Sequence, residues 1–600
     1  MNLLRPFFFF VCLFISLTQA VFAEEYVRTS TVSEVQKPVE AINLGNGSWF
    51  VDFGKDAFGN VGIIAPEGSD GTTITVKMGE MADGPEVVQS ENENIRYQSH
   101  EVALVEGKLV SPKLSWSPPW FLKEGWMTHP KGAGEVMPFR YVQIDNASKN
   151  FDESCIQRKV YHVPFNEEAS TFDSSNEDLN KVWNFCKYSI KATSAFGMYV
   201  DGDRERKPYE ADALINQLSH YCVDADYETA RHTMEYLLDH PTWPTEWQFH
   251  MVMMAWNDYM WSGDDSFIRK HYEVLKERAM LDRRTPDDLF QGVPFDWSAP
   301  MRDIVDWPDL ERDGYDMTVV TNTVVTAYYY HSLVLLQKMA EHLGKQNEAE
   351  EFSRLAKTTY KAFNEKLWNE ELGVYIDGLD ADGNPSTHSA SHANFFPLAF
   401  DLVPQERIPR VVKYIKNKGL VCSVYGAQFL LEALFKAGEA DYAVGLMTSS
   451  DTRSWLNMMK KVGSTITMEA WDPSLKPNLD WNHAWGAAPA NIIARYIAGI
   501  EPLEPGFKCF LVSPQIAGLD SFRYKLPVPQ GGINLSVKKA SRGFSEIILN
   551  VPEGAEAEYR FSGSRKISIW RMSEKLMEFK TEEEGFAVNL KSGNYKIVIR

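Results

Sequence analysis

Hydrophobic and polar positions alternate along the first part of the chain. Between residue 24 and about residue 165, short alternating or apolar runs such as 49–54, 73–77 and 139–144 are separated by Gly, Pro and Asp. Alternation with a period of two is typical of strands that bury one face. The pattern predicts an N-terminal β-sandwich over residues 24–165.

The hydrophobic period lengthens to about 3.6 residues near Ser174, as expected of helices. Ser175 with Asp178 resembles a helix start, and the next apolar residues form one face of a helix: Leu179, Val182, Trp183, Cys186 and Ile190. Similar stripes recur within 333–343 and 352–363, and Gly499 is predicted to end a helix over 492–498. The pattern over residues 166–500 therefore predicts a toroid of helical hairpins, in which long loops on one face carry the functional site. An ordinary helical solenoid is the alternative, although no fixed repeat period is visible.

From Glu501 the period shortens again. Runs at 534–537, 546–549 and 595–599 predict strands, so a second β-sandwich is expected over residues 501–600. A chain of 600 residues is too long for one hydrophobic core, since cores stop growing at about 250–300 residues. The expected order of domains is thus β-sandwich, large helical domain, β-sandwich.

The first 23 residues resemble an export signal. Arg5 is the only charged residue, 7–17 form an apolar run too short for a membrane span, and Val21-Phe22-Ala23 precede a predicted cut before Glu24. A cut after Ala20 is the alternative. No later stretch of about 18 apolar residues occurs, so we predict a periplasmic or secreted protein without a membrane partner.

Charge and cysteine content exclude several classes of function. The formal net charge is −21 and no basic stripe occurs, which argues against a nucleic-acid partner. Five cysteines follow the signal, an odd number without any CxxC pair: Cys155, Cys186, Cys222, Cys422 and Cys509. Buried free thiols are therefore expected rather than a disulfide framework or a metal site.

The densest cluster of charged residues is 201–206, followed by Glu210 and Asp212. A solvated loop is one interpretation, but the apolar and aromatic neighbours Val200 and Tyr209 indicate that part of the cluster faces a pocket. Burial and neighbouring carboxylates raise the pKa of a carboxylic acid, whereas adjacent arginines lower it. A Glu in this cluster is thus a candidate general acid.

A second carboxylate cluster spans 467–472 and continues through 480–486. Glu469 stands two residues before Trp471, and His483 and Trp485 follow, which indicates a pocket wall; a packed capping pair is the alternative. Two carboxylates far apart in sequence suit glycoside hydrolysis, in which their separation sets inversion or retention. Between the clusters, Trp247 and Trp307 each follow an acidic residue, and such pairs can offer a ring face and a hydroxyl acceptor to a sugar.

These motifs together resemble the bacterial α-L-rhamnosidases of glycoside hydrolase family 78. The resemblance rests on 172–175, 179–183 and the Arg204-Glu205-Arg206 triplet with Asp212 seven residues after the Glu. It extends over nearly the whole chain after the signal, through 51–54, 79–84, 425–428, 468–472 and 482–487. No single piece is specific, but their order and spacing together are.

The resemblance implies an (α/α)6 barrel as the catalytic domain, an inverting mechanism, and neither cofactor nor catalytic metal. It implies Glu205 as general acid and Glu469 as general base. It further implies that the sugar pocket is lined by Asp201, Arg206, Asp212, Trp247, Asp306, Trp307 and His483. The implied substrate is a terminal α-L-rhamnose of an oligosaccharide, a polysaccharide fragment or a glycoside.

The chain departs from the family pattern in two places. Asp201 stands four residues before Glu205 instead of five, with Gly202-Asp203 between them, so its side chain can sit differently. Residues 207–211 replace the common L-G-W-T-G, so a Tyr can stand where the family has a pocket Trp. Both changes concern the substituents of the sugar and the aglycone, and the sequence leaves the oligomeric state open.

Two other functions remain as alternatives. One is a different activity on the same barrel, such as a lyase or an exo-hydrolase for another sugar. The other is a non-catalytic glycan-binding protein, which would have no need to keep both Glu205 and Glu469.

Overall fold

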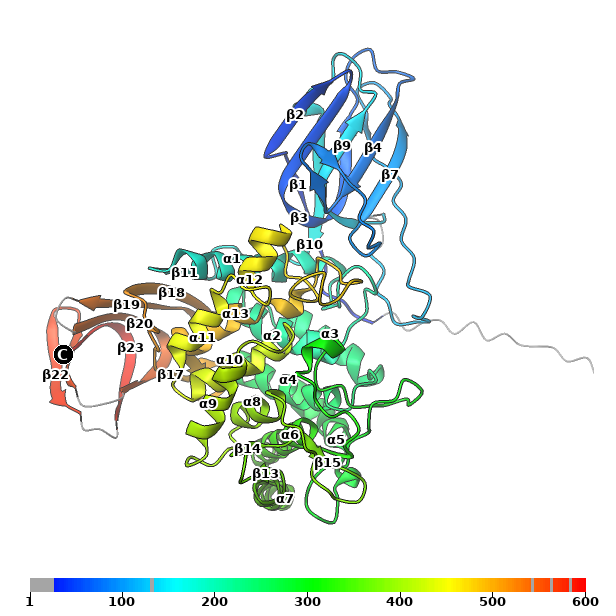
Figure 1. Cartoon of the computed structure of the whole chain (residues 1–600). Helices are drawn as coiled ribbons and strands as arrows, with labels where there is room; N and C mark the ends of the chain where they lie inside the picture. Colours follow the sequence, from blue (N-terminus) through cyan, green and yellow to red (C-terminus); the bar gives the residue numbers. More distant parts are fainter. Residues whose placement is uncertain (1–25, 130–133, 541–543, 562–564, 582–584) are drawn as a thin grey trace, which may run out of the picture.

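The computed structural model describes residues 26–129, 134–540, 544–561, 565–581 and 585–600. The predicted export signal, residues 1–23, lies outside these residues. Two strand-rich parts flank a helical part, as the hydrophobic periods predict (Figure 1). Within the described residues, every helix is too short or too polar to span a lipid bilayer.

The first part is an eight-stranded sheet built around one long strand. Strand β3 pairs with β2, β8, β9 and β10, and β9 continues through β4 to β7. The alternating residues predicted to be buried, such as Val51, Phe53, Val142 and Ile144, fill its core. The sheet contains β1 Val32–Gln36, β2 Glu40–Gly45, β3 Ser48–Ile64, β4 Thr73–Gly79, β7 Tyr97–Ala103, β8 Leu109–Val110, β9 Met137–Asp145 and β10 Ile156–His162, beside the short pair β5 Ala82–Asp83 and β6 Glu86–Val87.

The helical part contains, within the described residues, a closed ring of six helices. Each contacts the next, from α2 to α4, α6, α8, α10 and α13, and α13 contacts α2 again. Helix α2 is buried along its whole length and α10 along nearly all of it, as expected of helices that are apolar on every side. The ring consists of α2 Glu210–Val223, α4 Trp247–Ser262, α6 Thr323–His342, α8 His392–Ala399, α10 Gly426–Lys436 and α13 Ala488–Ile492, the last continued as a π-helix over Ile493–Ile497.

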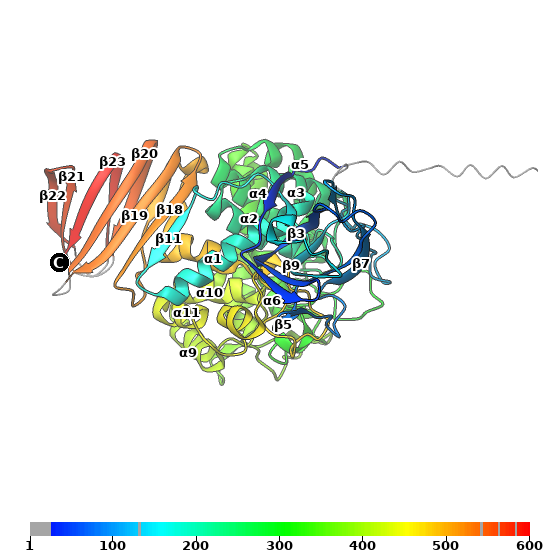
Figure 2. The same cartoon turned by 90° about the horizontal axis from the view of Figure 1, so that it is seen from above.

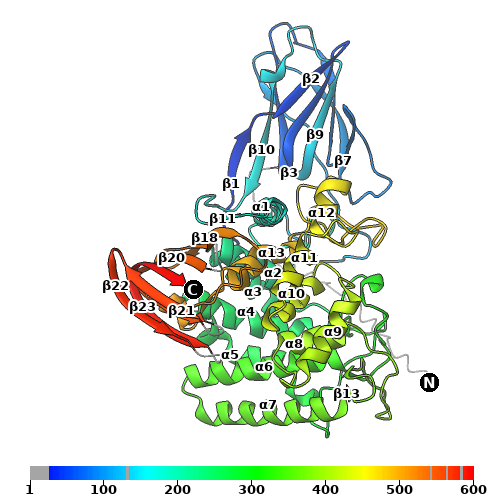
Figure 3. The same cartoon turned by 60° about the vertical axis from the view of Figure 1, so that its left-hand side comes forward.

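Six further helices lie outside the ring, and each precedes one of its members in the chain. Helix α7, for example, precedes α8 in the chain, packs along the outside of α6 and buries only one face (Figure 3). The outer helices are α1 Glu177–Ala192, α3 Glu228–Asp239, α5 Ser266–Arg278, α7 Gln346–Lys366, α9 Ile408–Lys418 and α11 Ala440–Met447; the short α12 Trp455–Asn457 and a π-helix over Met458–Val462 follow. Two short strand pairs, β12 Thr321–Asn322 with β15 Gly378–Leu379 and β13 Trp368–Asn369 with β14 Val374–Tyr375, stiffen the loops.

The last part is a nine-stranded sheet beside the helices (Figure 2). Its first strand in the sequence is β11, which precedes α1 and pairs with β18, so residues 171–174 join this sheet although they were expected in the helical domain. The sheet contains β11 Thr171–Ser174, β16 Ile500–Pro502, β17 Cys509–Val512, β18 Ser521–Val528, β19 Gly531–Ala540, β20 Phe544–Phe561, β21 Lys566–Arg571, β22 Glu574–Lys580 and β23 Phe586–Ile599.

Local predictions for α1 and for the cysteines need small corrections. The residue that caps α1 is Asn176, whose side chain accepts a hydrogen bond from the Leu179 amide at 3.0 Å, and not Ser175. The predicted apolar stripe of α1 is buried, and Gly499 follows the last helix with φ +67°. All five described cysteines are free thiols; four are buried and Cys509 is partly exposed.

Candidate active site

The loop between α1 and α2 carries the Arg204-Glu205-Arg206 triplet to one end of the helical ring. Gly202 adopts φ +94°, and a Cβ there would lie 2.6 Å from Oδ2 of Asp480. The neighbouring Asp203 amide donates to Oδ1 of Asn482 at 2.7 Å. The Gly202-Asp203 dipeptide that departs from the family pattern therefore packs against the segment 480–482.

The second cluster lies in the irregular segment that precedes α13. The Glu469 amide donates to the carbonyl of Asp480 at 3.2 Å, and the His483 amide donates to the carbonyl of Thr467 at 2.8 Å. Trp485 also donates its indole N–H to the carbonyl of Glu469 at 3.0 Å. These bonds fix the backbone of Glu469 and direct its side chain toward the loop at 201–206.

Arg204 joins the two predicted catalytic carboxylates. Its Nη1 donates to Glu469 Oε2 at 2.6 Å, and its Nη2 donates to Glu469 Oε1 at 2.8 Å and to Glu205 Oε1 at 3.2 Å. The same Nη2 lies 3.9 Å from Oδ2 of Asp201. All four side chains are largely buried, so this shared guanidinium balances charge that water screens only weakly.

The surroundings of Glu469 favour its ionised form. Lys476 Nζ lies 3.0 Å from Glu469 Oε2. Burial alone would raise the pKa of Glu469, but the positive charges of Arg204, Lys476 and His483 lower it to about 2. A carboxylate held ionised in this way can accept a proton from water.

Glu205 and Asp201 form an acidic pair beside that carboxylate. Tyr209 donates its hydroxyl to Glu205 Oε2 at 2.6 Å. Burial and the charge of Glu205 raise the pKa of Asp201 well above its ordinary value. Asp201 therefore keeps its proton to a higher pH than an exposed aspartate would.

His483 stands between two carboxylates at the base of the pocket. Its Nε2 lies 2.5 Å from Asp212 Oδ1 and its Nδ1 lies 3.2 Å from Asp480 Oδ1. Burial opposes protonation, but Asp212 and Asp480 together raise the pKa of His483 well above its ordinary value. His483 is therefore a fixed cation that orients Asp212.

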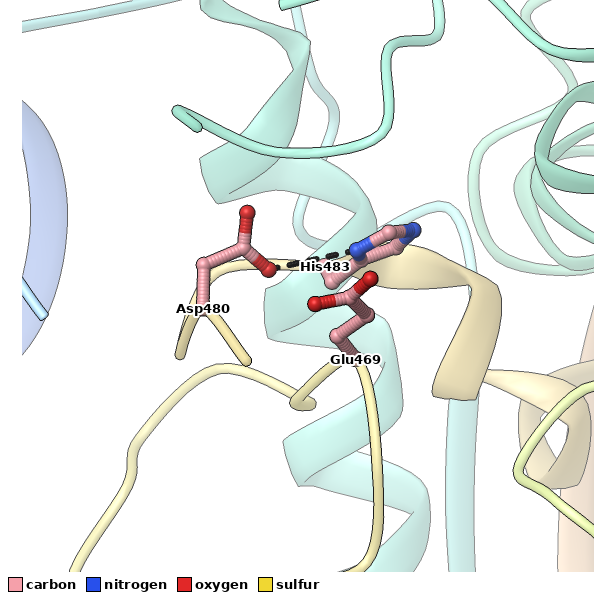
Figure 4. Close-up of side chains that lie close together, drawn as sticks. All are labelled: Glu469, Asp480 and His483. Atoms are coloured by element: carbon pink, nitrogen blue, oxygen red, sulfur yellow. Dashed lines mark hydrogen bonds and ion pairs between the residues drawn. The ribbon is translucent and has the colours of Figure 1, made fainter. Parts of the chain in front are cut away.

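Glu469, Asp480 and His483 also have the composition of a metal-binding group. Their candidate ligand atoms lie within 4.8 Å of one another, and Figure 4 shows the imidazole beside both carboxylates. Each of them already has partners, because His483 uses both ring nitrogens and Glu469 contacts Arg204 and Lys476. Hydrogen bonds and ion pairs account for this cluster.

The proposed acid–base residues and the cations that contact them face a pocket of about 620 Å³. One wall is aromatic: the Tyr209 ring lies 5.8 Å from that of Trp247, which lies 6.4 Å from that of Trp243. The other lining residues are Trp120, Phe121, Asp201, Arg204, Glu205, Asp212, Trp297, Arg302, Ile304, Trp307, Glu469, Lys476, Asn478, His483 and Trp485. Acid–base groups at one end of an aromatic pocket are an arrangement suited to a sugar substrate.

Seven of the nine predicted site residues line this pocket: Glu205, Glu469, Asp201, Asp212, Trp247, Trp307 and His483. Arg206 does not line it. With φ +52°, it turns its side chain toward the first sheet, where Nη1 lies 2.8 Å from Glu135 Oε1 and Nη2 donates to the carbonyl of Val136 at 3.0 Å.

Asp306 is likewise outside the pocket lining and is fully buried behind it. Its carboxylate accepts hydrogen bonds from the Ser423 amide at 2.9 Å and from the Trp307 amide at 2.8 Å, and lies 2.8 Å from His392 Nε2. The predicted sugar-binding role of Asp306 is thus replaced by support of the loop that presents Trp307.

Sequence reasoning missed several lining residues. Arg204 stood inside the quoted triplet, and its charge beside Glu205 was a usable signal. Arg302 begins the segment 302–308 that contains Asp306 and Trp307, but it was given no role of its own. Lys476 and the pair Trp120-Phe121 lie outside every quoted motif, and nothing in their local sequence marks them.

Comparisons with known proteins agree with this arrangement. A family model described as the bacterial alpha-L-rhamnosidase 6 hairpin glycosidase domain matches residues 167–497. The models of the concanavalin-like domain and the C-terminal domain of bacterial alpha-L-rhamnosidases match residues 42–162 and 499–569.

Two curated relatives named alpha-L-rhamnosidase resemble the chain in part. The protein of Alteromonas sp. (strain LOR) is 26% identical over 330 residues, which are 52% of this chain and 34% of the relative. The protein of Formosa agariphila is 23% identical over 516 residues, 78% of this chain and 53% of the relative. The chain thus spans about a third to a half of the length of these relatives.

Solved structures share the fold. The alpha-L-rhamnosidase from Dictyoglumus thermophilum superposes with a TM-score of 0.77 at 18% identity, covering 96% of this chain and 64% of that one. The Streptomyces avermitilis alpha-L-rhamnosidase complexed with L-rhamnose gives a TM-score of 0.74 at 17% identity, covering 96% of this chain and 54% of that one.

Proposed function

This chain belongs to the bacterial α-L-rhamnosidase family, and we propose that it is an exo-acting, inverting glycoside hydrolase. It removes terminal α-L-rhamnose from oligosaccharides, polysaccharide fragments or glycosides. The observation that carries this proposal is the pocket in which Arg204 and Lys476 hold Glu469 ionised beside the acidic pair Glu205 and Asp201.

In the proposed reaction, the Glu205 carboxyl group donates its proton to the glycosidic oxygen as the bond from that oxygen to C1 of rhamnose breaks. Glu469 removes a proton from a water molecule, whose oxygen forms the new bond to C1 on the opposite face. Free rhamnose and the protonated aglycone leave, and one proton has moved from Glu205 to Glu469. Asp212, Trp247, Trp307 and His483 bind the sugar, and no catalytic metal takes part.

The proposal includes the architecture and the location of the protein. The closed ring of six helices with six outer helices supports an (α/α)6 barrel over residues 166–500, between β-sandwiches over 24–165 and 501–600. Strand β11 lies within the segment assigned to the helical domain but pairs with β18 in the second sheet. Residues 1–23 are proposed as a cleaved signal that exports the protein to the periplasm or the medium.

The distance between the two carboxylates bears on whether the reaction inverts or retains the anomeric configuration, so the stereochemistry is measured in its own experiment. The Glu205 and Glu469 oxygens that share Nη2 of Arg204 are at most about 6 Å apart, whereas carboxyl groups lie about 5–5.5 Å apart in retaining and about 6.5–9.5 Å apart in inverting enzymes. Proton NMR of fresh reaction mixtures identifies the first anomer formed. This bound is shorter than the inverting range, and the expectation of inversion rests on the family resemblance. We therefore expect β-L-rhamnose, and α-L-rhamnose as the first product would contradict inversion.

The primary test is hydrolysis of p-nitrophenyl α-L-rhamnopyranoside by the full chain, by Glu205→Gln and by Glu469→Ala. Each variant is expected to lose at least about 10² in turnover, the usual contribution of acid–base catalysis. Azide should restore turnover to Glu469→Ala and give rhamnosyl azide as the product, because this small anion can occupy the place of the attacking water. Equal activity of Glu205→Gln and wild type would exclude Glu205 as the acid.

Two further assays separate the alternatives. A lyase would form an unsaturated sugar that absorbs in the ultraviolet from a uronate-containing oligosaccharide, and would keep this activity in Glu205→Gln. A binding protein would show a calorimetric rhamnose signal and no turnover by the wild type on any rhamnoside.

A further inference from the structure

The aromatic wall of the pocket leads outward from the general acid. Tyr209, which donates to Glu205, begins the wall, and Trp247 and Trp243 continue it. The outer part of the wall is the more exposed, since Trp247 is 5% exposed and Trp297 at the far end is 62% exposed. The leaving group must lie on the side of the acid that protonates it, so the part of the wall beyond Trp247 borders the sugar next to rhamnose.

Arg302 lies between the last two tryptophans of the wall. Its guanidinium carbon lies 3.8 Å from the ring centroid of Trp243 and 4.8 Å from that of Trp297. The residue is only 8% exposed, and its Nη1 donates to the carbonyl of Ala299 at 2.7 Å. The stacking rings fix the plane of the guanidinium before any ligand arrives.

Arg302 has spare hydrogen-bonding and charge capacity. Among the residues that the structure describes, Arg302 forms no ion pair: the charge of Asp296 acts on it without direct contact, and its Nε is buried with no hydrogen-bond partner. Arg204, Arg206 and Arg312, three other arginines in or near this region, each contact a carboxylate. A largely buried arginine that lines a pocket without a counter-ion indicates that the ligand supplies the negative charge.

A second wall of the pocket mouth comes from the N-terminal part of the chain. Trp120 and Phe121 lie in the segment between β8 and β9, which reaches the helical part where the Trp116 indole donates to the carbonyl of Asp203 at 2.8 Å. Trp120 is 87% exposed. An exposed Trp at a pocket mouth offers a ring face on which a second sugar can stack.

We propose that the outer half of the pocket is a subsite for an anionic sugar, carrying a carboxylate or a sulfate, to which the terminal rhamnose is linked. This inference rests on the proposed rhamnosidase function and adds the class of the neighbouring sugar. Arg302 binds the anionic group through its planar fork, while Trp120 and Trp297 contact the sugar ring.

Charge also sets the orientation of such a substrate. At the inner end of the pocket, the cations Arg204, Lys476 and His483 are each already paired with Glu469 or Asp212, so no unpaired positive charge is left there for an anion. Rhamnose is uncharged and suits the inner end, whereas an anionic sugar is favoured only beside Arg302. The pocket therefore discriminates between the two ends of a rhamnosyl-uronate or rhamnosyl-sulfosugar disaccharide.

The test uses three disaccharides that differ only in the second sugar. They are α-L-rhamnosyl-(1→4)-glucuronic acid, its carboxyl-reduced form α-L-rhamnosyl-(1→4)-glucose, and the 6-sulfate of that glucose disaccharide. Rhamnose release is measured as kcat/KM for the full chain, Arg302→Gln and Arg354→Gln. Arg354 is the matched control, since it pairs with Glu351 on the outer helix α7 and loses the same charge.

We expect the wild type and Arg354→Gln to favour at least one anionic disaccharide over the neutral one by roughly tenfold or more, the size of a charge-assisted hydrogen bond. Arg302→Gln should abolish this preference, because its kcat/KM falls by roughly tenfold more for the preferred anionic disaccharide than for the neutral one. Whichever anionic disaccharide is preferred identifies a carboxylate or a sulfate as the natural group. Trp120→Ala should lower kcat/KM for all three disaccharides but not for methyl α-L-rhamnoside, whose aglycone is too small to reach the mouth.

Two outcomes would overturn the inference while leaving the proposed function intact. One is equal kcat/KM of the wild type for all three disaccharides. The other is an equal loss on all three in Arg302→Gln, which would assign Arg302 to holding Trp243 and Trp297 in place. Failure of the wild type to release rhamnose from any of these substrates or from the nitrophenyl glycoside would instead contradict the proposed function.

Discussion

Arg204 sets the charge balance of the pocket. It donates to both oxygens of Glu469 and to one of Glu205, and it is buried with them. An arginine remains protonated at any pH at which the protein is folded, so its charge stabilises the base as a carboxylate throughout. In the proposed mechanism, the proton for the leaving group comes from Glu205.

Lys476 is the second cation on the base, and its removal gives a prediction about pH dependence. Its charge helps to lower the pKa of Glu469 to about 2, so Lys476→Met should raise that pKa. Because the base must be ionised, the acidic limb of the kcat/KM profile should move to higher pH by roughly one unit. Lys476→Arg should keep the wild-type limb, and so should Lys461→Met, which removes an exposed lysine of the preceding segment. An unshifted limb in Lys476→Met would show that Glu469 does not set it.

At the scale of elements, the pocket depends on how α4 meets the loop that follows α5. Glu246 precedes α4, and its carboxyl group accepts hydrogen bonds from the amides of Ile304 and Val305. This contact positions the stretch that carries Arg302 and Trp307. Burial and the charge of Asp303 raise the pKa of Glu246 to about 8.

The raised pKa of Glu246 predicts a loss of stability at alkaline pH. A carboxyl group that binds its proton more tightly when folded stabilises the fold below its unfolded pKa, and this contribution declines as pH rises toward the folded value. The free energy of unfolding should therefore fall between pH 5.5 and pH 8 by roughly 2–3 kcal/mol more in the wild type than in Glu246→Gln. Urea titrations at both pH values measure the difference, with Glu365→Gln as an exposed control on α7. Parallel pH slopes in wild type and Glu246→Gln would contradict the expectation.

At the scale of the whole molecule, the first sheet holds the back of the catalytic loop. Arg96 forms an ion pair with the Asp203 carboxylate and donates to the Asp203 carbonyl at 2.7 Å. Arg206 adds its ion pair with Glu135. The N-terminal part of the chain therefore helps to position Glu205, two residues beyond Asp203, without touching the catalytic carboxylates.

This clamp predicts that a substitution outside the helical part lowers turnover. Arg96→Met should reduce kcat roughly 10- to 100-fold, because small displacements of catalytic groups have effects of this size. Arg140→Met is the matched control, since Arg140 pairs with Asp52 within the first sheet and has a similarly exposed side chain. Melting temperatures measured beside kcat separate the two effects: both variants lose stability, and only Arg96→Met loses turnover per folded molecule. An unaffected kcat in Arg96→Met would mean that the loop keeps its shape unaided.

The sequence by itself determined the division into strand-rich, helical and strand-rich parts, because hydrophobic periods of two and about 3.6 residues are local properties of the chain. The quoted motifs also singled out Glu205, Glu469 and five more of the 18 residues that line the pocket, since these stand in short segments whose order is informative. Tertiary structure decided the rest. Arg204 and Arg206 are two positions apart, yet one enters the pocket and the other faces the first sheet, because Gly202 and Arg206 both adopt positive φ. Distant loops close around the pocket, and no local pattern specifies such long-range contacts. These contacts bring Lys476, Arg302 and Trp120 into the pocket lining and leave Asp306 outside it.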